Sequence, residues 1–253
     1  MPNLTISDVT LTFGGLHALS AVNMELAPGL ITSIIGPNGA GKTCILNCVS
    51  GFYHPSSGDI HFNGQRLTKL SPHQVSKIGI SRAFQNLELF RGLSVLDNLM
   101  LARHKNLTYS LVHAVVFWGK ASRIEAENRE HVEEVIDFME LEPYRKQTVG
   151  SLSYGVQKRV EVARALTLSP QVILLDEPMA GMNVEEKEDM VRFIFDIKNE
   201  WGLTVVLVEH DLGVVMDISD HIYVLDFGEV IGSGSAQQVA SNPKVIEAYI
   251  GEE

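Results

Sequence analysis

The chain has 253 residues, the length of one large α/β domain or of a domain with a subdomain. Apolar residues make up 45% of it, enough for a packed core, and a net charge of −11 argues against a basic nucleic-acid-binding face. The two cysteines, Cys44 and Cys48, indicate no disulfide framework and fit a reducing compartment. No secretory signal is visible, and the most apolar run, at 111–118, is far shorter than the roughly 20 residues of a membrane span.

Short apolar runs alternate with helical stretches along the chain. This alternation predicts a mainly parallel sheet that is covered by helices on both faces. The runs at 172–175 and 205–208 contain no polar residue, which is typical of central parallel strands. The predicted strands are 6–13, 30–35, 172–175, 204–208 and 222–225.

Two segments depart from this alternation. At 58–67, Asn63-Gly64 lies between short extended pieces and predicts a hairpin turn. The stretch 95–146 is rich in charged residues and strong helix formers. We therefore expect a single domain over 1–253, with an α/β core and antiparallel β portion at 1–85 and 155–253 and an inserted helical subdomain at about 90–150.

The most specific motif lies between the predicted strand at 30–35 and a helical segment at 44–49. It is Gly36-Pro37-Asn38-Gly39-Ala40-Gly41-Lys42-Thr43. It matches the phosphate-binding pattern G-x-x-x-x-G-K-[ST], in the strand–loop–helix context that this pattern requires.

The residue types of this loop explain what it binds. Its glycines allow the backbone to curl so that successive N–H groups point inward. The following helix directs its unpaired N–H groups and the positive end of its dipole at the same anion. Lys42 supplies a positive charge to the β- and γ-phosphates, and Thr43 offers a hydroxyl to Mg²⁺. The predicted ligand is a nucleoside polyphosphate with Mg²⁺.

Two further candidate ligand sites follow the loop in the chain, a pair of carboxylates after a strand and the start of a helix. Asp176 and Glu177 come directly after the strand at 172–175, at the edge where open α/β sheets place their ligand chemistry. Asp176 suits Mg²⁺ coordination, and Glu177 suits polarisation of an attacking water. Ser153 and Gly155 precede a helical run at 158–168, where on their own they favour an ordinary helix cap over an anion site.

Taken in order, these motifs resemble those of an ATP-binding cassette (ABC) ATPase over nearly the whole chain. The resemblance assigns 36–43 to the Walker A loop, 152–156 to the signature sequence, 172–177 to Walker B and 180–183 to the D-loop. It implies ATP and Mg²⁺ as cofactors and a phosphate-binding-loop NTPase core with an antiparallel β subdomain and a helical subdomain. The implied nucleotide contacts are Phe13, Gly36, Pro37, Asn38, Gly39, Ala40, Gly41, Lys42, Thr43, Cys44, Ser153 and Gly155; the implied metal ligands are Thr43, Gln85 and Asp176; and the implied catalytic residues are Glu177, His210 and Gln85.

The chain departs from the general family pattern at four positions, which are Cys44, Tyr154, Val156 and Asn183. Tyr154 and Asn183, together with the Phe-Gly-Gly at 13–15 and the tail at 242–251, resemble the ATPase subunits of branched-chain amino acid importers. That resemblance implies membrane-spanning permease subunits, a second ATPase chain and, indirectly, an extracytoplasmic solute-binding protein as partners, and no nucleic acid. It also implies a location at the cytoplasmic face of the membrane.

Three other functions remain open at this point. A soluble ABC ATPase outside transport is disfavoured by the single cassette and the acidic charge, and a small-molecule kinase or GTPase by the segment 152–157 and the missing Asn-Lys-x-Asp motif. An exporter subunit is not distinguished from an importer subunit. The transported solute and the choice between a homodimer and a heterodimer also stay open.

Cys44 has two interpretations. Its place at a helix N-terminus favours the thiolate, which predicts alkylation that bound ATP prevents. The alternative, slightly favoured, is that Cys44 only packs in the first helical turn.

Overall fold

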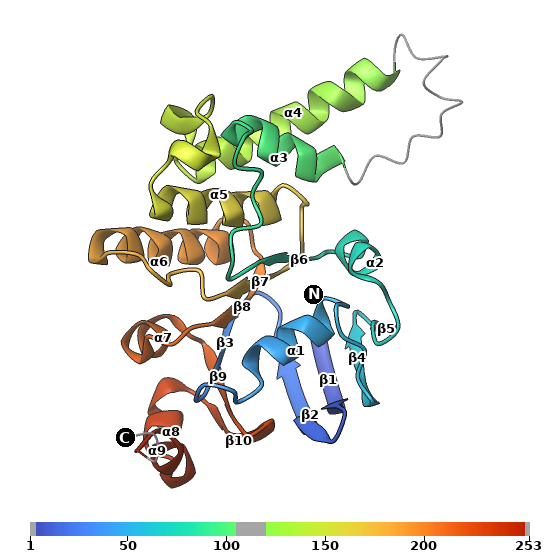
Figure 1. Cartoon of the computed structure of the whole chain (residues 1–253), viewed down its shortest axis with the longest axis vertical. Coiled ribbons are helices and arrows are strands. Elements are labelled where there is room, and N and C mark those ends of the chain that lie inside the picture. The colour runs from blue at the N-terminus through green and yellow to red at the C-terminus, as the bar shows by residue number, and fades with distance from the viewer. Residues whose placement is uncertain (1–3, 105–119, 251–253) are drawn as a thin grey trace.

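The computed structural model describes residues 4–104 and 120–250, whose strands form two sheets (Figure 1). The larger sheet has the strand order β10-β9-β3-β8-β7-β6. All its strand pairs are parallel except β9 with β10. Its strands are β3 (Ile31–Ile35), β6 (Ile80–Ala83), β7 (Val172–Asp176), β8 (Thr204–Val208), β9 (His221–Asp226) and β10 (Glu229–Gly234).

The mainly parallel sheet is thus as predicted, and the unbroken apolar runs are its central strands. Every residue of β3, β7 and β8 is buried. Along β7, Val172 and Leu174 belong to one core cluster, whereas Ile173 and Leu175 belong to another. Because side chains alternate between the faces of a strand, this division shows that the sheet is covered on both faces.

The smaller sheet is antiparallel, with the order β2-β1-β4-β5. Its strands are β1 (Leu4–Phe13), β2 (Leu16–Leu26), β4 (Ser57–Phe62) and β5 (Gln65–Arg66). The predicted turn is confirmed, because Asn63 and Gly64 join β4 to β5 with φ angles of 52° and 78°. Positive φ at both central residues is the geometry of a tight hairpin turn. The sequence did not predict β2.

The helices gather around the larger sheet and at one end of the molecule. In Figure 1, α3 and α4 lie beyond α5, at the end opposite α8 and α9. The helices are α1 (Lys42–Val49), α2 (Pro72–Lys77), α3 (Val95–His104), α4 (Lys120–Phe138), α5 (Tyr154–Leu166), α6 (Val184–Asn199), α7 (Leu212–Ile218), α8 (Ala236–Ala240) and α9 (Pro243–Ile250), with short 3-10 turns η1 (Glu142–Tyr144) and η2 (Val149–Ser151).

Helix boundaries differ from the sequence predictions where a cap decides them. α1 begins at Lys42, two residues before the predicted start, directly after Gly41. α5 begins at Tyr154, four residues early, because the Ser153 side chain caps it by accepting from the Val156 N–H. Of the described helices, none combines the length and apolar character that crossing a membrane requires. The apolar run at 111–118 lies outside the described residues.

Candidate functional site

The loop 36–43 joins β3 to α1, and two of its glycines are required by close backbone contacts. Gly36 has φ 148°, and a Cβ there would overlap the carbonyl oxygen of Leu225. Gly41 has φ 102°, and its Cβ would lie 2.8 Å from the Ala18 carbonyl oxygen. The loop therefore follows a path that only glycine permits at these two positions.

The N-terminus of α1 is open toward the loop. No side chain caps it in the described structure, and its first turn contains no acidic residue. The Lys42 side chain is buried and lies across the loop, where its Nζ donates to the carbonyl oxygens of Gly36 at 2.6 Å and Pro37 at 2.8 Å. The N–H groups of the helix start, its positive end and a lysine thus meet in one place, which is an anion-binding arrangement.

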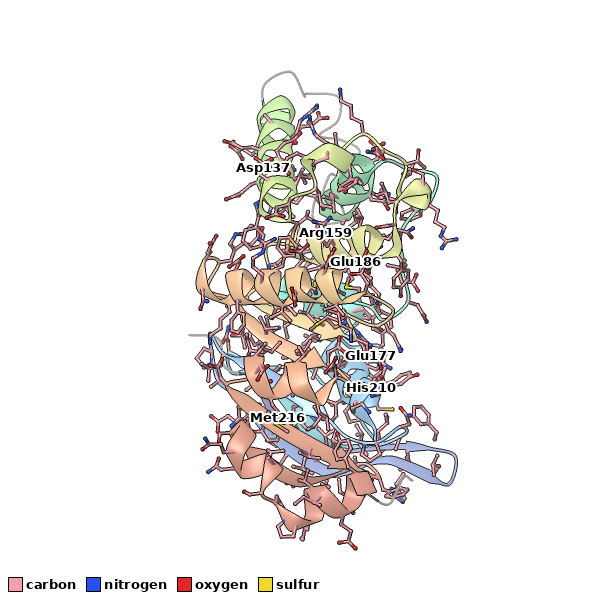
Figure 2. The ribbon with its side chains drawn as sticks, turned by 90° about the vertical axis from the view of Figure 1, so that its left-hand side faces the viewer. Asp137, Arg159, Glu177, Glu186, His210 and Met216 are labelled. Carbon is pink, nitrogen blue, oxygen red and sulfur yellow. The ribbon has the colours of Figure 1, made fainter. Side chains whose placement is uncertain are left out.

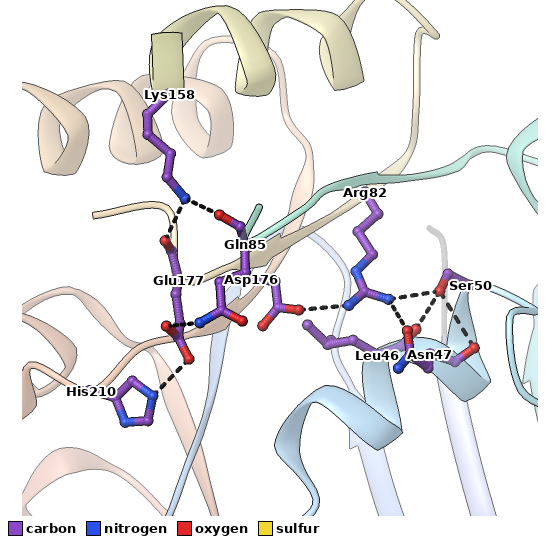
Figure 3. Close-up of polar contacts among 9 residues, drawn as sticks. All are labelled: Leu46, Asn47, Ser50, Arg82, Gln85, Lys158, Asp176, Glu177 and His210. Carbon is purple, nitrogen blue, oxygen red and sulfur yellow. Dashed lines mark hydrogen bonds and ion pairs between the residues drawn. The ribbon is translucent and has the colours of Figure 1, made fainter. Parts of the chain in front are cut away.

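The three predicted catalytic residues meet, because Gln85 and His210 both contact the Glu177 carboxylate. Its Oε2 accepts from Gln85 Nε2 at 2.6 Å, and its Oε1 lies 2.7 Å from His210 Nε2 (Figure 3). Figure 2 shows Glu177 and His210 next to each other. Glu177 is nearly buried and has φ 50°, a backbone conformation that is uncommon outside glycine and often found at functional sites.

Asp176 precedes Glu177 at the end of β7 and is almost wholly buried. Its Oδ2 accepts from Arg82 Nη2 at 2.6 Å, whereas its Oδ1 has no hydrogen-bond partner among the described residues. A buried carboxylate oxygen without a partner is costly unless a ligand satisfies it. Mg²⁺ prefers oxygen ligands, and Thr43, an exposed residue at the start of α1, carries a hydroxyl group. The donor set therefore fits the metal.

Sequence reasoning missed Lys158 of α5, which is 1% exposed. Its Nζ donates to the backbone carbonyl oxygens of Gln85 at 2.7 Å and Glu177 at 3.2 Å (Figure 3). Burial lowers the pKa of Lys158, and nearby carboxylates, Glu161 first, oppose that effect. The ammonium group thus ties the start of the signature helix to the backbone of two predicted catalytic residues.

Glu209, the neighbour of His210, was also missed. Its Oε1 accepts from the Met179 N–H at 2.8 Å and its Oε2 from the His210 N–H at 3.2 Å. Burial raises the pKa of Glu209, and these two hydrogen bonds oppose the shift. The carboxylate joins the loop after β7 to the loop after β8. Nothing in the sequence near Glu209 distinguishes it from an ordinary strand-end acid.

The signature residues lie against the D-loop and not in the Glu177 cluster. Gly155 is so close to the Glu186 side chain that a Cβ would overlap it, and the ring of Tyr154 lies against Gly181. Asn183 caps α6 by accepting from the Glu186 N–H at 2.9 Å, and Glu186 accepts in return from the Asn183 N–H. Asparagine caps a helix as well as aspartate does, which explains why the departure at 183 is tolerated locally.

Phe13, the predicted adenine contact, stands at the end of β1 with 47% of its surface exposed. Tyr53, which follows α1, meets it edge to face, with ring centroids 5.2 Å apart. An edge contact leaves ring faces available for stacking on a base. Sequence reasoning missed Tyr53, because nothing in its neighbourhood indicates a partner on β1.

The expected thiolate at Cys44 is wrong. Burial raises the pKa of the Cys44 thiol, and Cys44 packs against the apolar cluster beneath α1. Cys48, one turn further, has a pKa raised to about 12, first by burial and then by Cys44. Desolvation disfavours the charged form of the thiol. Burial and packing favour the packing interpretation of Cys44.

Comparison with known proteins identifies what the chain is similar to. A family model described as ABC transporter matches residues 19–180, and one described as branched-chain amino acid ATP-binding cassette transporter matches 229–253. The chain is 38% identical to the high-affinity branched-chain amino acid transport ATP-binding proteins BraF of Pseudomonas aeruginosa and LivG of Escherichia coli, over 99% of this chain and 98% of each relative. The crystal structure of the ADP conformation of an ATP-binding cassette of an ABC transporter superposes with a TM-score of 0.86 at 30% identity, covering 99% of both chains.

Proposed function

This chain belongs to the ABC transporter family, and from this premise we propose that it hydrolyses ATP to drive a membrane importer of branched-chain amino acids or similar small solutes. One observation carries the proposal of hydrolysis, which is the convergence of Gln85 and His210 on the two carboxylate oxygens of Glu177. This cluster stands at the same edge of the sheet as the loop 36–43, because the parallel strands β3 and β7 both end there. The full-length similarity to branched-chain amino acid transport ATP-binding proteins supports this function over a soluble ABC ATPase outside transport.

In the proposed reaction the chain mainly positions and stabilises charge. Phe13 stacks on the adenine, the loop N–H groups and Lys42 bind the phosphates, and Glu177 orients the attacking water and accepts its proton. His210 holds the γ-phosphate side of the site, and Gln85 keeps Glu177 in place. Thr43, Gln85 and Asp176 would hold Mg²⁺, which supplies positive charge against the phosphate oxygens.

A second ATPase chain completes the proposed site. The N-terminus of α5, with Ser153 and Gly155, would face the ATP of the partner in a head-to-tail dimer, since a helix start suits a phosphate. Tyr154 is an exposed aromatic residue at this end and would form part of the same surface. Val156 is buried and offers no polar contact, in place of the usual glutamine.

Membrane-spanning permease subunits are the other proposed partners, with an extracytoplasmic solute-binding protein acting through them. We place this chain at the cytoplasmic face of the membrane and assign the permease contact to the helical segment at about 90–150, next to Gln85. Phe90 and Leu93 support this assignment, because both are large apolar residues exposed at its beginning.

Co-purification and turnover test the proposal together. The tagged chain, expressed with its neighbouring permease subunits, is expected to be recovered with them from detergent extracts and to hydrolyse ATP. In proteoliposomes that hydrolysis should rise with a solute-loaded binding protein. Recovery of the chain without membrane protein would contradict the proposed transport role. Transfer of the γ-phosphoryl group of ATP to a small molecule, and not to water, would contradict the proposed hydrolysis.

Replacing Lys158 by Met is expected to lower turnover on the order of 10²-fold, because Gln85 and Glu177 lose the group that fixes their backbone. ATP affinity should change little, since the hydrogen bonds of Lys158 go to Gln85 and Glu177 and not to the phosphate-binding residues proposed for the loop 36–43. Steady-state rates and equilibrium ATP binding check this, with circular dichroism for folding. Lys187→Met is the control, because it removes only a half-exposed ion pair with Asp211. Equal turnover in the two variants would disprove the role of Lys158.

A further inference from the structure

Arg82 of β6 lies between Walker A and Walker B and has no role assigned so far. Its side chain is 5% exposed. Its Nη2 donates to Asp176 Oδ2 at 2.6 Å, and its Nη1 donates to Asn47 Oδ1 at 2.7 Å and Ser50 Oγ at 3.2 Å (Figure 3). The guanidinium group also lies 4.8 Å from the centre of the Phe84 ring. One buried side chain therefore holds β7 on one side and α1 on the other.

The α1 end of this contact is fixed with respect to Thr43. Asn47 and Ser50 follow Thr43 by four and seven residues, a spacing that places all three on one face of a helix. The Ser50 hydroxyl donates to the Leu46 carbonyl at 2.6 Å, so its oxygen is left to accept from Arg82. Arg82 thus binds the face of α1 on which Thr43 lies.

The β7 end is equally specific. Arg82 occupies Asp176 Oδ2, whereas Oδ1 is buried and lacks a partner among the described residues. A planar guanidinium with several fixed donors sets the orientation of a carboxylate, which a lysine ammonium does less well. Because the pair is almost wholly buried, bulk water competes little with Arg82 for Asp176.

We propose that Arg82 is a positioning residue for Mg²⁺, which sets the separation and orientation of Thr43 and Asp176 by binding α1 and β7 at once. The inference rests on the proposed function, in which these two residues hold the metal of Mg-ATP. Partners behind metal ligands commonly change metal affinity by about 10- to 100-fold when they are removed. The hydrogen bonds of Arg82 go to Asp176, Asn47 and Ser50, so binding of metal-free nucleotide should depend on it little.

The test compares ADP affinity, by titration calorimetry, in Mg²⁺ and in EDTA. The Mg²⁺ gain is the ratio of ADP affinity in Mg²⁺ to ADP affinity in EDTA. In Arg82→Met this gain is expected to be about 10-fold or more below that of the wild type, with the affinity in EDTA within about 2-fold of wild type. The Mg²⁺ gain of Arg82→Lys should lie between those of the wild type and Arg82→Met, because one ammonium group cannot bridge α1 and β7 as well as a guanidinium group does. Arg103→Met is the control, since Arg103 is a partly buried arginine of α3 that bonds Thr167 and Asn128 away from the site.

An unchanged Mg²⁺ gain in Arg82→Met, or an equal loss of affinity in Mg²⁺ and EDTA, would overturn the inference. If Arg82→Met does not fold, Asn47→Ala replaces it in the test. This variant removes only the Asn47 contact of Arg82 on α1, at 2.7 Å, and should also reduce the Mg²⁺ gain in ADP affinity. An unchanged gain in a folded Asn47→Ala would then count against it. A wild-type protein that binds no adenine nucleotide would refute the proposed function, which is a different result from any of these.

Discussion

Replacing Glu177 by Gln is expected to leave ATP bound and to reduce its hydrolysis by about 10²- to 10⁴-fold. The amide keeps the shape of the side chain and can still bond Gln85 and His210, whose contacts are 2.6 and 2.7 Å from the carboxylate. It cannot accept a proton from water. The loop 36–43 is untouched, so ATP affinity should stay near that of the wild type, and the ATP-bound dimer should accumulate.

Phosphate release in a single turnover, ATP binding and light scattering for the dimer measure these three effects. Glu185→Gln is the matched control, because Glu185 is an exposed acid in the first turn of α6. It should hydrolyse ATP at the wild-type rate. Wild-type hydrolysis in Glu177→Gln itself would show that another group activates the water.

Gly36→Ala is expected to abolish most nucleotide binding and to destabilise the fold by about 2–4 kcal/mol. An alanine Cβ would overlap the backbone carbonyl of Leu225 in β9, which cannot move without breaking the sheet. The loop must therefore shift, and the N–H groups that face the phosphates shift with it. Urea unfolding and ATP titration measure the two losses.

Gly29→Ala separates backbone strain from overlap. Gly29 also has a positive φ, 70°, but a Cβ there meets no atom within 4 Å. Its expected cost is about 1–2 kcal/mol from the φ angle alone, with ATP affinity unchanged. If Gly36→Ala cost no more than Gly29→Ala and bound ATP normally, the close contact with Leu225 would have no part in shaping the loop.

The sequence predicted those parts of the fold that local pattern determines. The strands β7 and β8 follow from unbroken apolar runs, and the Asn63-Gly64 turn from its residue types. It did not predict β2, whose pairing with β1 is interrupted by register shifts and whose Ala21 has a positive φ. Such interruptions remove the regular alternation from which a strand is predicted.

Two residues of the site that the sequence did not predict, Arg82 and Lys158, share one physical reason. Arg82 and Lys158 are charged side chains whose partners lie 94 and 73 residues away in the chain. A single charge in a sequence predicts an exposed residue, and only the fold shows that it is buried against a specific acceptor. The thiolate hypothesis for Cys44, the less favoured of its two interpretations, is opposed for another reason: the helix dipole can be inferred from sequence, whereas the extent of burial cannot.

The division of β7 between two cores has a mechanical consequence. Ile173 and Leu175 are packed among side chains of α5 and α6, while Val172 and Leu174 are packed with those of α1 and the antiparallel sheet. Close-packed protein interiors transmit strain. A displacement of α5 or α6 by a partner would therefore push β7 against a second packed core. The C-terminal end of β7, which carries Asp176 and Glu177, would move with it.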